Sequence, residues 1–347
     1  MFDLQEESRE LVERAQVDWS ALEGKTVLIT GATGLVGGHL VRFLLEANKL
    51  RDVNVAVIAP VRSLERARAA FEDYSADEHL VFIEGDLMTA DYGAHRFDYI
   101  VHAACPTASK FFAANPVETA DAIVLGTRRL LDIAREQNVT SFVYVSSMEI
   151  YGDGNPERGL DKLLTVHNVG YVDPLSIRSC YPEGKRMAEM YCAAYAKEYG
   201  VNAKAIRLAQ TFGPGVPKND TRLFAMVARN AMNRTDIVLK TTGESTRMYL
   251  YTTDAVLAIM TVLLKGEAGC SYNAANPDTY SSVREMAERV AAKYGDGKCN
   301  VVIDLDPNAP YPPEHHLPLD VSSLIELGWK PEVNLEGMFG NLIDYLR

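Results

Sequence analysis

Short apolar runs and stretches of helical periodicity alternate along the chain from about residue 25 to residue 208. The runs at 25–30, 54–59 and 141–146 are rich in β-branched residues and carry no polar face, which is typical of strands buried on both sides. Apolar residues at helical spacing separate these runs, as in 40–47 and 116–137. Strands that alternate with helices predict a parallel sheet with helices on both faces, so we expect an α/β fold with a Rossmann-type, doubly wound sheet.

The two ends of the chain depart from this pattern. Residues 4–22 combine many charges with apolar positions at loose helical spacing, which predicts one amphipathic helix ahead of the main fold. Beyond about residue 208, Pro- and Gly-rich segments and scattered helices indicate a smaller substrate-binding region that closes over the carboxyl ends of the strands. We therefore expect a helical extension at 1–22, a doubly wound α/β domain at 23–208 that also takes part of 246–270, and a mainly substrate-binding region at 209–347.

Composition and charge argue against nucleic-acid binding, membrane association and metal binding. With 35 Lys and Arg against 47 Asp and Glu, the formal charge is −12, so the chain lacks the basic field that draws proteins to nucleic acid or anionic membranes. The five cysteines show no C-x-x-C spacing, and no His, Cys and carboxylate cluster has metal-ligand spacing. The N-terminal sequence has no apolar signal segment, and no run of about 18 apolar residues predicts a membrane helix. We expect a cytoplasmic protein with no metal, no nucleic-acid partner and no membrane association.

A glycine-rich motif, GATGLVG at 31–37, lies between the first predicted strand of the sheet and the helix that follows it. Gly31 would permit a tight turn, Gly34 the close approach of a pyrophosphate, and Gly37 the packing of helix on strand, while the helix N-terminus adds partial positive charge. A glycine turn with a purely structural role is the alternative, and the strand-turn-helix context favours dinucleotide binding. The expected cofactor contacts here are Gly31, Thr33, Gly34, Leu35, Val36 and Gly37.

The ends of the second and third strands bear on which dinucleotide binds. Arg62 and Ser63 stand where an acidic residue would select NAD, so they favour NADP; the alternative is NAD with Arg62 in solvent or stacked on the adenine. Asp86 and Leu87 could hold the adenine edge, unless Asp86 only forms a turn. The sequence thus leaves NAD and NADP both open.

Tyr181 and Lys185 stand four residues apart at the start of a predicted helix, and so on one face of it. Because an ammonium stabilises a neighbouring phenolate, we expect Lys185 to lower the pKa of Tyr181 and make it a base. The Tyr-x-x-x-Lys spacing is common and often structural, but the nucleotide-binding pattern ahead of it favours catalysis. Ser147 directly follows a very apolar strand, where its hydroxyl would reach the active cleft and bond to a substrate oxygen.

Taken in order, these motifs resemble the extended short-chain dehydrogenase/reductases that act on nucleotide sugars, the NAD-dependent epimerase/dehydratase family. The resemblance runs from about residue 24 to the end of the chain. The segments 102–126, 173–189 and 213–223 look closest to UDP-glucuronate decarboxylases. The Ser-x-Glu triplet at 147–149 is similar to that of sugar 4,6-dehydratases, whereas simple 4-epimerases usually lack the Glu.

The resemblance implies a role for each matching residue of the predicted active site. Tyr181 would take the proton from a sugar 4-hydroxyl while hydride passes to a tightly bound NAD or NADP, and Lys185 would hold the nicotinamide ribose. Ser147 would polarise the oxygen that becomes a carbonyl. Glu149 would act at C5 as a general base or proton relay, in decarboxylation or dehydration, unless it is only a salt-bridged carboxylate at a strand end. Ala103 and Ala104, after the fourth strand, are expected in the cofactor site.

The resemblance also implies partners. A nucleoside-diphosphate sugar is the expected substrate. The residues expected to contact its nucleotide or phosphates are Gln210, Asn219, Arg222 and Arg247. The alternative is that they are ordinary surface side chains. The helices at about 116–137 and 181–199 correspond to those through which family members commonly pair, so a homodimer is expected.

Some departures from the family patterns leave the reaction open. Met148 stands where dehydratases carry an acid, and His315 with His316 stands where decarboxylases carry an Arg. Phe111 and Phe112 stand near a usual decarboxylase Tyr. A 4-epimerase is therefore an alternative within the enzyme class. A non-catalytic nucleotide-binding or scaffold protein is the alternative from another class, and the intact Ser, Tyr and Lys set argues against it.

Overall fold

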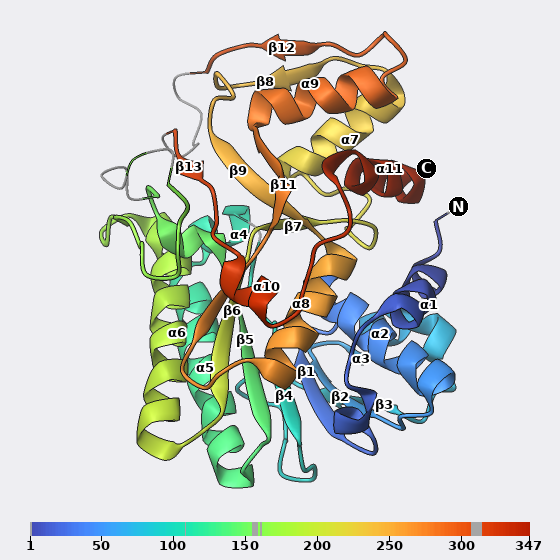
Figure 1. Cartoon of the computed structure of the whole chain (residues 1–347), viewed down its shortest axis with the longest axis vertical. Coiled ribbons are helices and arrows are strands. Elements are labelled where there is room, and N and C mark those ends of the chain that lie inside the picture. The colour runs from blue at the N-terminus through green and yellow to red at the C-terminus, as the bar shows by residue number, and fades with distance from the viewer. Residues whose placement is uncertain (1, 108, 155–158, 160–161, 307–313) are drawn as a thin grey trace.

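The computed structural model describes residues 2–107, 109–154, 159, 162–306 and 314–347, and it confirms the predicted α/β class. A large lobe fills the lower half of Figure 1 and a smaller lobe lies above it. In the described part of the chain, the large lobe holds a seven-stranded sheet in the order β10-β6-β5-β4-β1-β2-β3. All its neighbouring pairs are parallel, and the order reverses at β1, which lies between β4 and β2. Doubly wound folds bind their ligands at such a reversal, beyond the carboxyl ends of the strands.

The elements of the large lobe follow the predicted alternation closely. Its strands are β1 Thr26–Thr30, β2 Ala56–Val61, β3 Leu80–Glu84, β4 Tyr99–His102, β5 Ser141–Ser147, β6 Ala203–Leu208 and β10 Ser271–Ala274. Its helices are α2 Leu35–Arg51, α3 Leu64–Ala70, α4 Ser109–Ala114, α5 Pro116–Gln137, α6 Cys180–Tyr199 and α8 Thr252–Lys265, with the short 3-10 helices η2 Glu72–Tyr74, η3 Met148–Tyr151 and η5 Ile177–Ser179.

Both faces of the central strands of the large sheet are buried, which explains the continuous apolar runs of these strands. In β1, Val27 and Ile29 belong to a core shared with α2 and α8, whereas Leu28 belongs to a second core shared with α5 and α6. Successive side chains of a strand point to opposite faces, so a sheet covered on both sides needs an apolar residue at every position.

The smaller lobe has its own sheet and its own core. Its strands are β7 Gln210–Phe212, β8 Ile237–Leu239, β9 Thr246–Tyr251, β11 Asn276–Ser282, β12 Val301–Ile303 and β13 His316–Leu317, and its helices are α7 Leu223–Asn233, α9 Val283–Tyr294 and α11 Leu335–Leu346. The short helix α10 Ser322–Glu326 packs on β10 and α8, and its Leu324 belongs to the core of the large lobe. In the core of the smaller lobe the Phe212 ring lies 4.7 Å from that of Phe224 and 4.9 Å from that of Phe339, measured between ring centres. Strand β9 pairs with β7, β11 and β13.

The predicted single helix over 4–22 is wrong in its second half. Helix α1 spans Leu4–Arg14 and ends because Ala15 is extended, with φ −66° and ψ 129°. A separate 3-10 helix, η1 Trp19–Leu22, follows and is capped by the Asp18 side chain. The two pieces turn so that Leu22 is buried and the Trp19 ring packs 5.6 Å from that of Phe43 on α2, which one straight helix would not allow.

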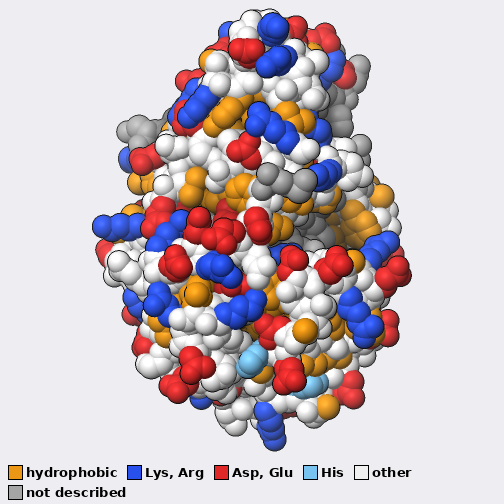
Figure 2. Space-filling model, turned by 90° about the vertical axis from the view of Figure 1, so that its right-hand side faces the viewer, with side chains coloured by type: hydrophobic (Ala, Val, Ile, Leu, Met, Phe, Trp, Pro, Cys, Tyr) orange, Lys and Arg blue, Asp and Glu red, His pale blue; other side chains and the backbone are white. Residues whose placement is uncertain are grey.

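The surface carries charges of both signs. Figure 2, which shows the face at the right of Figure 1, has acidic and basic side chains interspersed over both lobes. Among the described helices, none combines the length and the apolar character needed to cross a bilayer.

Candidate active site

The glycine motif forms a tight turn at the strand-order reversal. A Cβ atom at Gly37 would lie 2.2 Å from the Gly31 carbonyl oxygen, and one at Gly31, whose φ is +72°, would lie 2.8 Å from the Ala103 backbone. Gly34 caps α2 without any side-chain hydrogen bond, and the first turn contains no acidic residue. The backbone N–H groups of that turn, including those of Leu35 and Val36, are therefore available to an anion. This cradle fits a dinucleotide pyrophosphate.

The packing of this turn gives a direct prediction. Gly37→Ala should weaken NAD binding by more than about tenfold, because the added methyl forces the Gly31 carbonyl out of place and with it the phosphate cradle. Titration of NAD against the purified variant measures this. Gly38→Ala is the control, since its Cβ would meet no atom closer than 3.2 Å and should change affinity much less. Equal affinity in the wild type and the Gly37 variant would contradict the assignment.

The adenosine-side residues are partly engaged in local structure. The Ser63 hydroxyl caps α3 by accepting a hydrogen bond from the Arg66 backbone at 3.3 Å. Asp86 Oδ1 accepts from the Met88 and Thr89 backbone N–H groups, both at 2.8 Å, so this side chain forms a turn. Arg62 is exposed, and Leu87 packs against α5 next to Gly126. Arg62 is thus the member of this group whose charge is most open to a ligand.

The four predicted catalytic residues come from three elements, β5, η3 and α6. Ser147 ends β5, and its hydroxyl accepts from the Glu149 backbone at 3.2 Å, which places the exposed Glu149 in η3 directly beyond the strand. Tyr181 lies in the first turn of α6, is 7 % exposed, and is near enough to the Ser147 hydroxyl for that group to act on its pKa. Lys185 is one turn further, with Nζ 5.6 Å from the centre of the Tyr181 ring. The sheet end and the helix start thus bring the predicted set together.

The electrostatics of Tyr181 differ from the expectation. Burial raises the pKa of Tyr181 well above its usual range, the Cys105 thiol and the Glu149 carboxylate act in the same direction, and the Ser147 hydrogen bond opposes them. The predicted lowering by Lys185 is wrong for this structure. Burial lowers the pKa of Lys185 itself, and its Nζ donates to the Val145 carbonyl at 2.8 Å rather than to the phenol.

Several contacts around this set were not predicted. The Phe112 ring stacks on Tyr181 at 5.2 Å and 21°, and the Cys105 thiol lies near enough to Lys185 to oppose the lowering of its pKa. Arg186 donates to the Ile150 carbonyl at 2.6 Å and to the Gly170 carbonyl at 2.7 Å, which ties α6 to η3. The only sequence signal for Arg186 is its position next to Lys185, because the carbonyls that it binds come from distant segments.

The predicted substrate contacts lie in or beside the smaller lobe. Gln210 on β7 pairs in register with Tyr249 on β9, the strand that carries Arg247. Arg247 Nη2 lies 3.3 Å from His315 Nε2, and its Nε is buried without a hydrogen-bond partner. Arg222, in contrast, is paired with Asp220 at 2.6 Å, and Asn219 is exposed. Arg247 is therefore the better placed of the two arginines to receive an anion.

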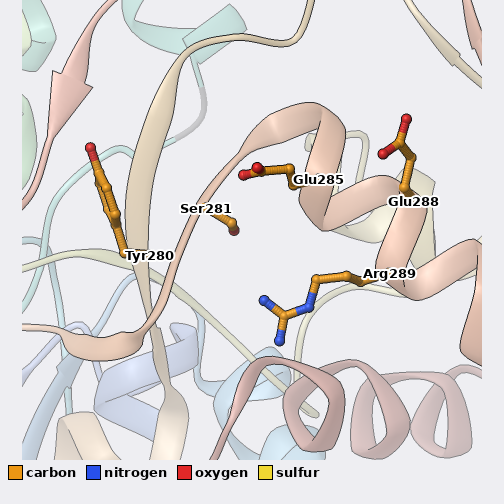
Figure 3. A pocket seen from close by; sticks show the side chains of 5 residues that line it. All are labelled: Tyr280, Ser281, Glu285, Glu288 and Arg289. Carbon is orange, nitrogen blue, oxygen red and sulfur yellow. The ribbon is translucent and has the colours of Figure 1, made fainter.

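A hollow in the smaller lobe is not part of this site. It has a volume of about 350 Å³, and Figure 3 shows its lining side chains, which come from β11 and α9. Glu285 accepts from the Ser282 backbone at 2.8 Å, Glu288 binds Arg284 at 2.8 Å, and Arg289 pairs with Glu336 at 2.6 Å. The charged groups that line the hollow are thus already paired with neighbouring residues of the fold. Among the described residues, no group of His, Cys and carboxylate side chains is arranged to hold a metal ion.

Comparisons with known proteins show the family to which this chain belongs. The model of the NAD dependent epimerase/dehydratase family matches residues 27–275. The chain is 30% identical over 316 residues to UDP-glucuronic acid decarboxylase 6 of Arabidopsis thaliana, which covers 90% of this chain and 86% of the relative. It is 28% identical over 329 residues to UDP-glucuronic acid decarboxylase 1 of Xenopus tropicalis, covering 94% and 73%.

Solved structures show the same architecture. The dTDP-glucose 4,6-dehydratase DesIV of Streptomyces venezuelae, solved with NAD bound, has a TM-score of 0.75 and 25% identity, covering 92% of this chain and 96% of that chain. The UDP-N-acetylglucosamine 4-epimerase of Methanobrevibacter ruminantium shares the fold with a TM-score of 0.77 at 20% identity, covering 93% and 98%. The predicted resemblance is confirmed: this chain belongs to the NAD-dependent epimerase/dehydratase family.

Proposed function

We propose that this protein is an NAD-dependent enzyme that decarboxylates UDP-glucuronic acid through transient oxidation of the sugar at C4. The observation that carries the proposal is the meeting of Ser147, Tyr181 and Lys185, with Glu149 two residues beyond the serine. The similarity to UDP-glucuronic acid decarboxylases over about nine-tenths of the chain supports the choice of reaction. Met148 supports it too, because a dehydratase carries an acid at that position to protonate a departing hydroxyl.

Each residue has a part in this chemistry. Tyr181 takes the proton of the 4-hydroxyl, and Ser147 donates a hydrogen bond to the same oxygen. The 4-keto group then accepts the electron pair of the C5–carboxylate bond as carbon dioxide leaves, and Glu149 relays a proton to C5. NAD, when bound, supplies hydride acceptance and return, and its oxidised ring adds positive charge that favours the Tyr181 phenolate. Lys185 holds the ribose, and the glycine turn at 31–37 holds the pyrophosphate.

A product assay tests the reaction. Purified protein with NAD and UDP-glucuronic acid should release carbon dioxide and give a nucleotide sugar lighter by that mass. Loss of water from dTDP-glucose would instead indicate a dehydratase, and a product of unchanged mass an epimerase; either result overturns the decarboxylase proposal. A protein that binds NAD and converts none of these sugars would indicate the non-catalytic alternative.

The role of Glu149 gives a second prediction. Glu149→Gln should slow release of carbon dioxide by about a hundredfold or more, because the amide cannot relay a proton, while C4 oxidation continues. Absorbance of reduced NAD follows the oxidation, and product mass follows the decarboxylation. Glu198→Gln, an exposed change on α6, is the matched control and should behave as wild type. A Glu149 variant with normal turnover would assign this carboxylate a structural role.

The assembly and the division of the chain are also part of the proposal. A homodimer through α5 and α6 is supported by large apolar side chains that this pair of helices exposes, including Val117 at 66% and Met190 at 49%. Residues 23–208 with part of 246–270 would bind the cofactor, and 209–347 the nucleotide sugar. A cytoplasmic setting is supported by the five cysteines, all of which are free.

A further inference from the structure

Helix α1 precedes the family match at 27–275, yet it is built into the fold. Leu11 and Val12 are at most 1% exposed and pack with α2 in the large core. Gln5 donates to Glu46 of α2 at 2.9 Å, while Arg14 pairs with Glu332, ahead of α11, at 2.9 Å. In Figure 1 the helix lies beside α2, below α11. It therefore contacts the helix that starts at the glycine turn and also a segment that leads into the smaller lobe.

Glu7 is the buried polar centre of this contact. Its side chain is 11% exposed; Oε1 accepts a hydrogen bond from the Tyr251 hydroxyl, and Asn341 of α11 donates to that same hydroxyl at 2.9 Å. Oε2 is buried without a hydrogen-bond partner and lies 3.7 Å from Nδ1 of His39. Burial raises the pKa of Glu7 to about 7, although the Tyr251 hydrogen bond and the Arg14 charge oppose this rise. The proton on Glu7 is thus retained up to neutral pH.

His39 connects Glu7 to the segment that leads to the predicted substrate contacts. It lies on α2, two residues after Gly37, and its Nε2 is 2.9 Å from the Pro214 carbonyl. A carbonyl can only accept, so Nε2 must carry the hydrogen, and because burial lowers the pKa of His39 to about 4 the ring is neutral and Nδ1 is an acceptor. A Cβ at Gly215 would lie 3.2 Å from this ring, which shows how closely the turn 213–215 packs on α2.

The two protonation states of Glu7 make opposite demands on this ring. Oε2 and Nδ1 face each other slightly beyond hydrogen-bond distance, so a protonated Oε2 that moves a little closer can donate to Nδ1, and His39 then keeps its Nε2 hydrogen for Pro214. An ionised Glu7 is an acceptor and favours a hydrogen on Nδ1, which leaves Nε2 facing the Pro214 carbonyl as a second acceptor. One hydrogen atom therefore cannot serve Glu7 and Pro214 at the same time.

We propose that Glu7 is a positioning residue, which in its protonated form lets His39 hold the turn 213–215 against the cofactor helix and so orders the substrate-binding segment that follows. The hydrogen bond from His39 to Pro214 is kept below about pH 7 and is weakened as the pH rises through that value. The inference rests on the proposed nucleotide-sugar function. The charged and titratable groups that face Glu7 and its two partners are Glu10 and Arg14 on α1, Arg42 on α2 and Asp254 on α8.

Binding of UDP-glucuronic acid to the full-length, NAD-loaded protein tests this role of Glu7, because neither the diphosphate nor the carboxylate of the ligand titrates near neutral pH. Wild-type affinity should fall about fivefold between about pH 6 and pH 8.5, the effect of one lost hydrogen bond. Glu7→Gln, whose amide can always donate to His39, should keep the pH 6 affinity throughout. Glu13→Gln changes the charge of α1 equally at an exposed position that does not act on Glu7, and it should follow the wild type. A Glu7 variant with the wild-type pH profile would overturn the proposal.

A second measurement needs no substrate. Nitrogen-15 spectra of labelled histidine, with His39→Gln for assignment, report which ring nitrogen carries the hydrogen. The Nε2–H form should dominate at about pH 6 and give way above pH 7 in the wild type, but not in Glu7→Gln. A wild-type ring that keeps one form across this range contradicts the inference. Failure of UDP-glucuronic acid to bind at any pH would instead refute the proposed function, and the ring spectra would then decide the role of Glu7 alone.

Discussion

Tyr181→Phe is expected to lower kcat by about a thousandfold with UDP-glucuronic acid, because the variant loses the oxygen that takes the 4-hydroxyl proton. The aromatic ring remains, and with it the stacking on Phe112 at 5.2 Å, so the fold and the pocket shape should survive. Rapid-mixing measurement of reduced NAD isolates the oxidation step from later ones. The first appearance of reduced NAD should slow as much as overall turnover.

Tyr191→Phe is the matched control for this change. Tyr191 lies on the same helix, and its ring packs edge-on against Tyr195 at 6.4 Å, in the neighbourhood of α5 rather than of Ser147. The control should retain wild-type turnover and thermal stability. If Tyr181→Phe also retained turnover, another group would have to remove the proton, and the proposed role of Tyr181 as the base would be wrong.

Arg207→Met is expected to lower the free energy of unfolding by about 4 kcal/mol, because it leaves a buried carboxylate without its partner. The Arg207 and Glu189 side chains are 7% and 9% exposed, and their closest contact is 2.7 Å. Arg207 also donates to the Tyr151 hydroxyl at 2.9 Å and to the Val166 carbonyl at 2.8 Å. Urea denaturation, followed by circular dichroism, measures the loss.

The double change Arg207→Met with Glu189→Met separates the ion pair from the remaining contacts. It should recover much of the lost stability, because no unpaired charge then stays buried. The Tyr151 contact also links Arg207 to η3, which contains Glu149, so the single variant should lose turnover as well. If the free energy of unfolding of Arg207→Met were within about 1 kcal/mol of the wild-type value, Glu189 would have to be hydrogen-bonded by water or by another side chain.

Much of the large lobe could be predicted from local pattern. Each of the strands β1, β2 and β5 is an apolar run because both faces of the sheet are covered, and the glycine spacing at 31–37 follows from a turn that leaves no room for a Cβ. The four-residue spacing of Tyr181 and Lys185 placed them correctly on one face of a helix. The family assignment followed from these motifs in order, and the family model confirms it.

What local pattern could not supply is the environment that distant segments create. Spacing on a helix shows which side chains are neighbours, but it does not show how deeply they are buried. It therefore predicted a lowered pKa for Tyr181, whereas burial and the Cys105 thiol raise that pKa. The same reason explains the contact of Glu7 with His39, which lies on another helix. The sequence by itself determined the succession of strands, turns and helices along the chain and pointed to the residues proposed as the catalytic set. The tertiary structure alone decided which charges are desolvated and which partners they meet, because desolvation depends on atoms far away along the chain.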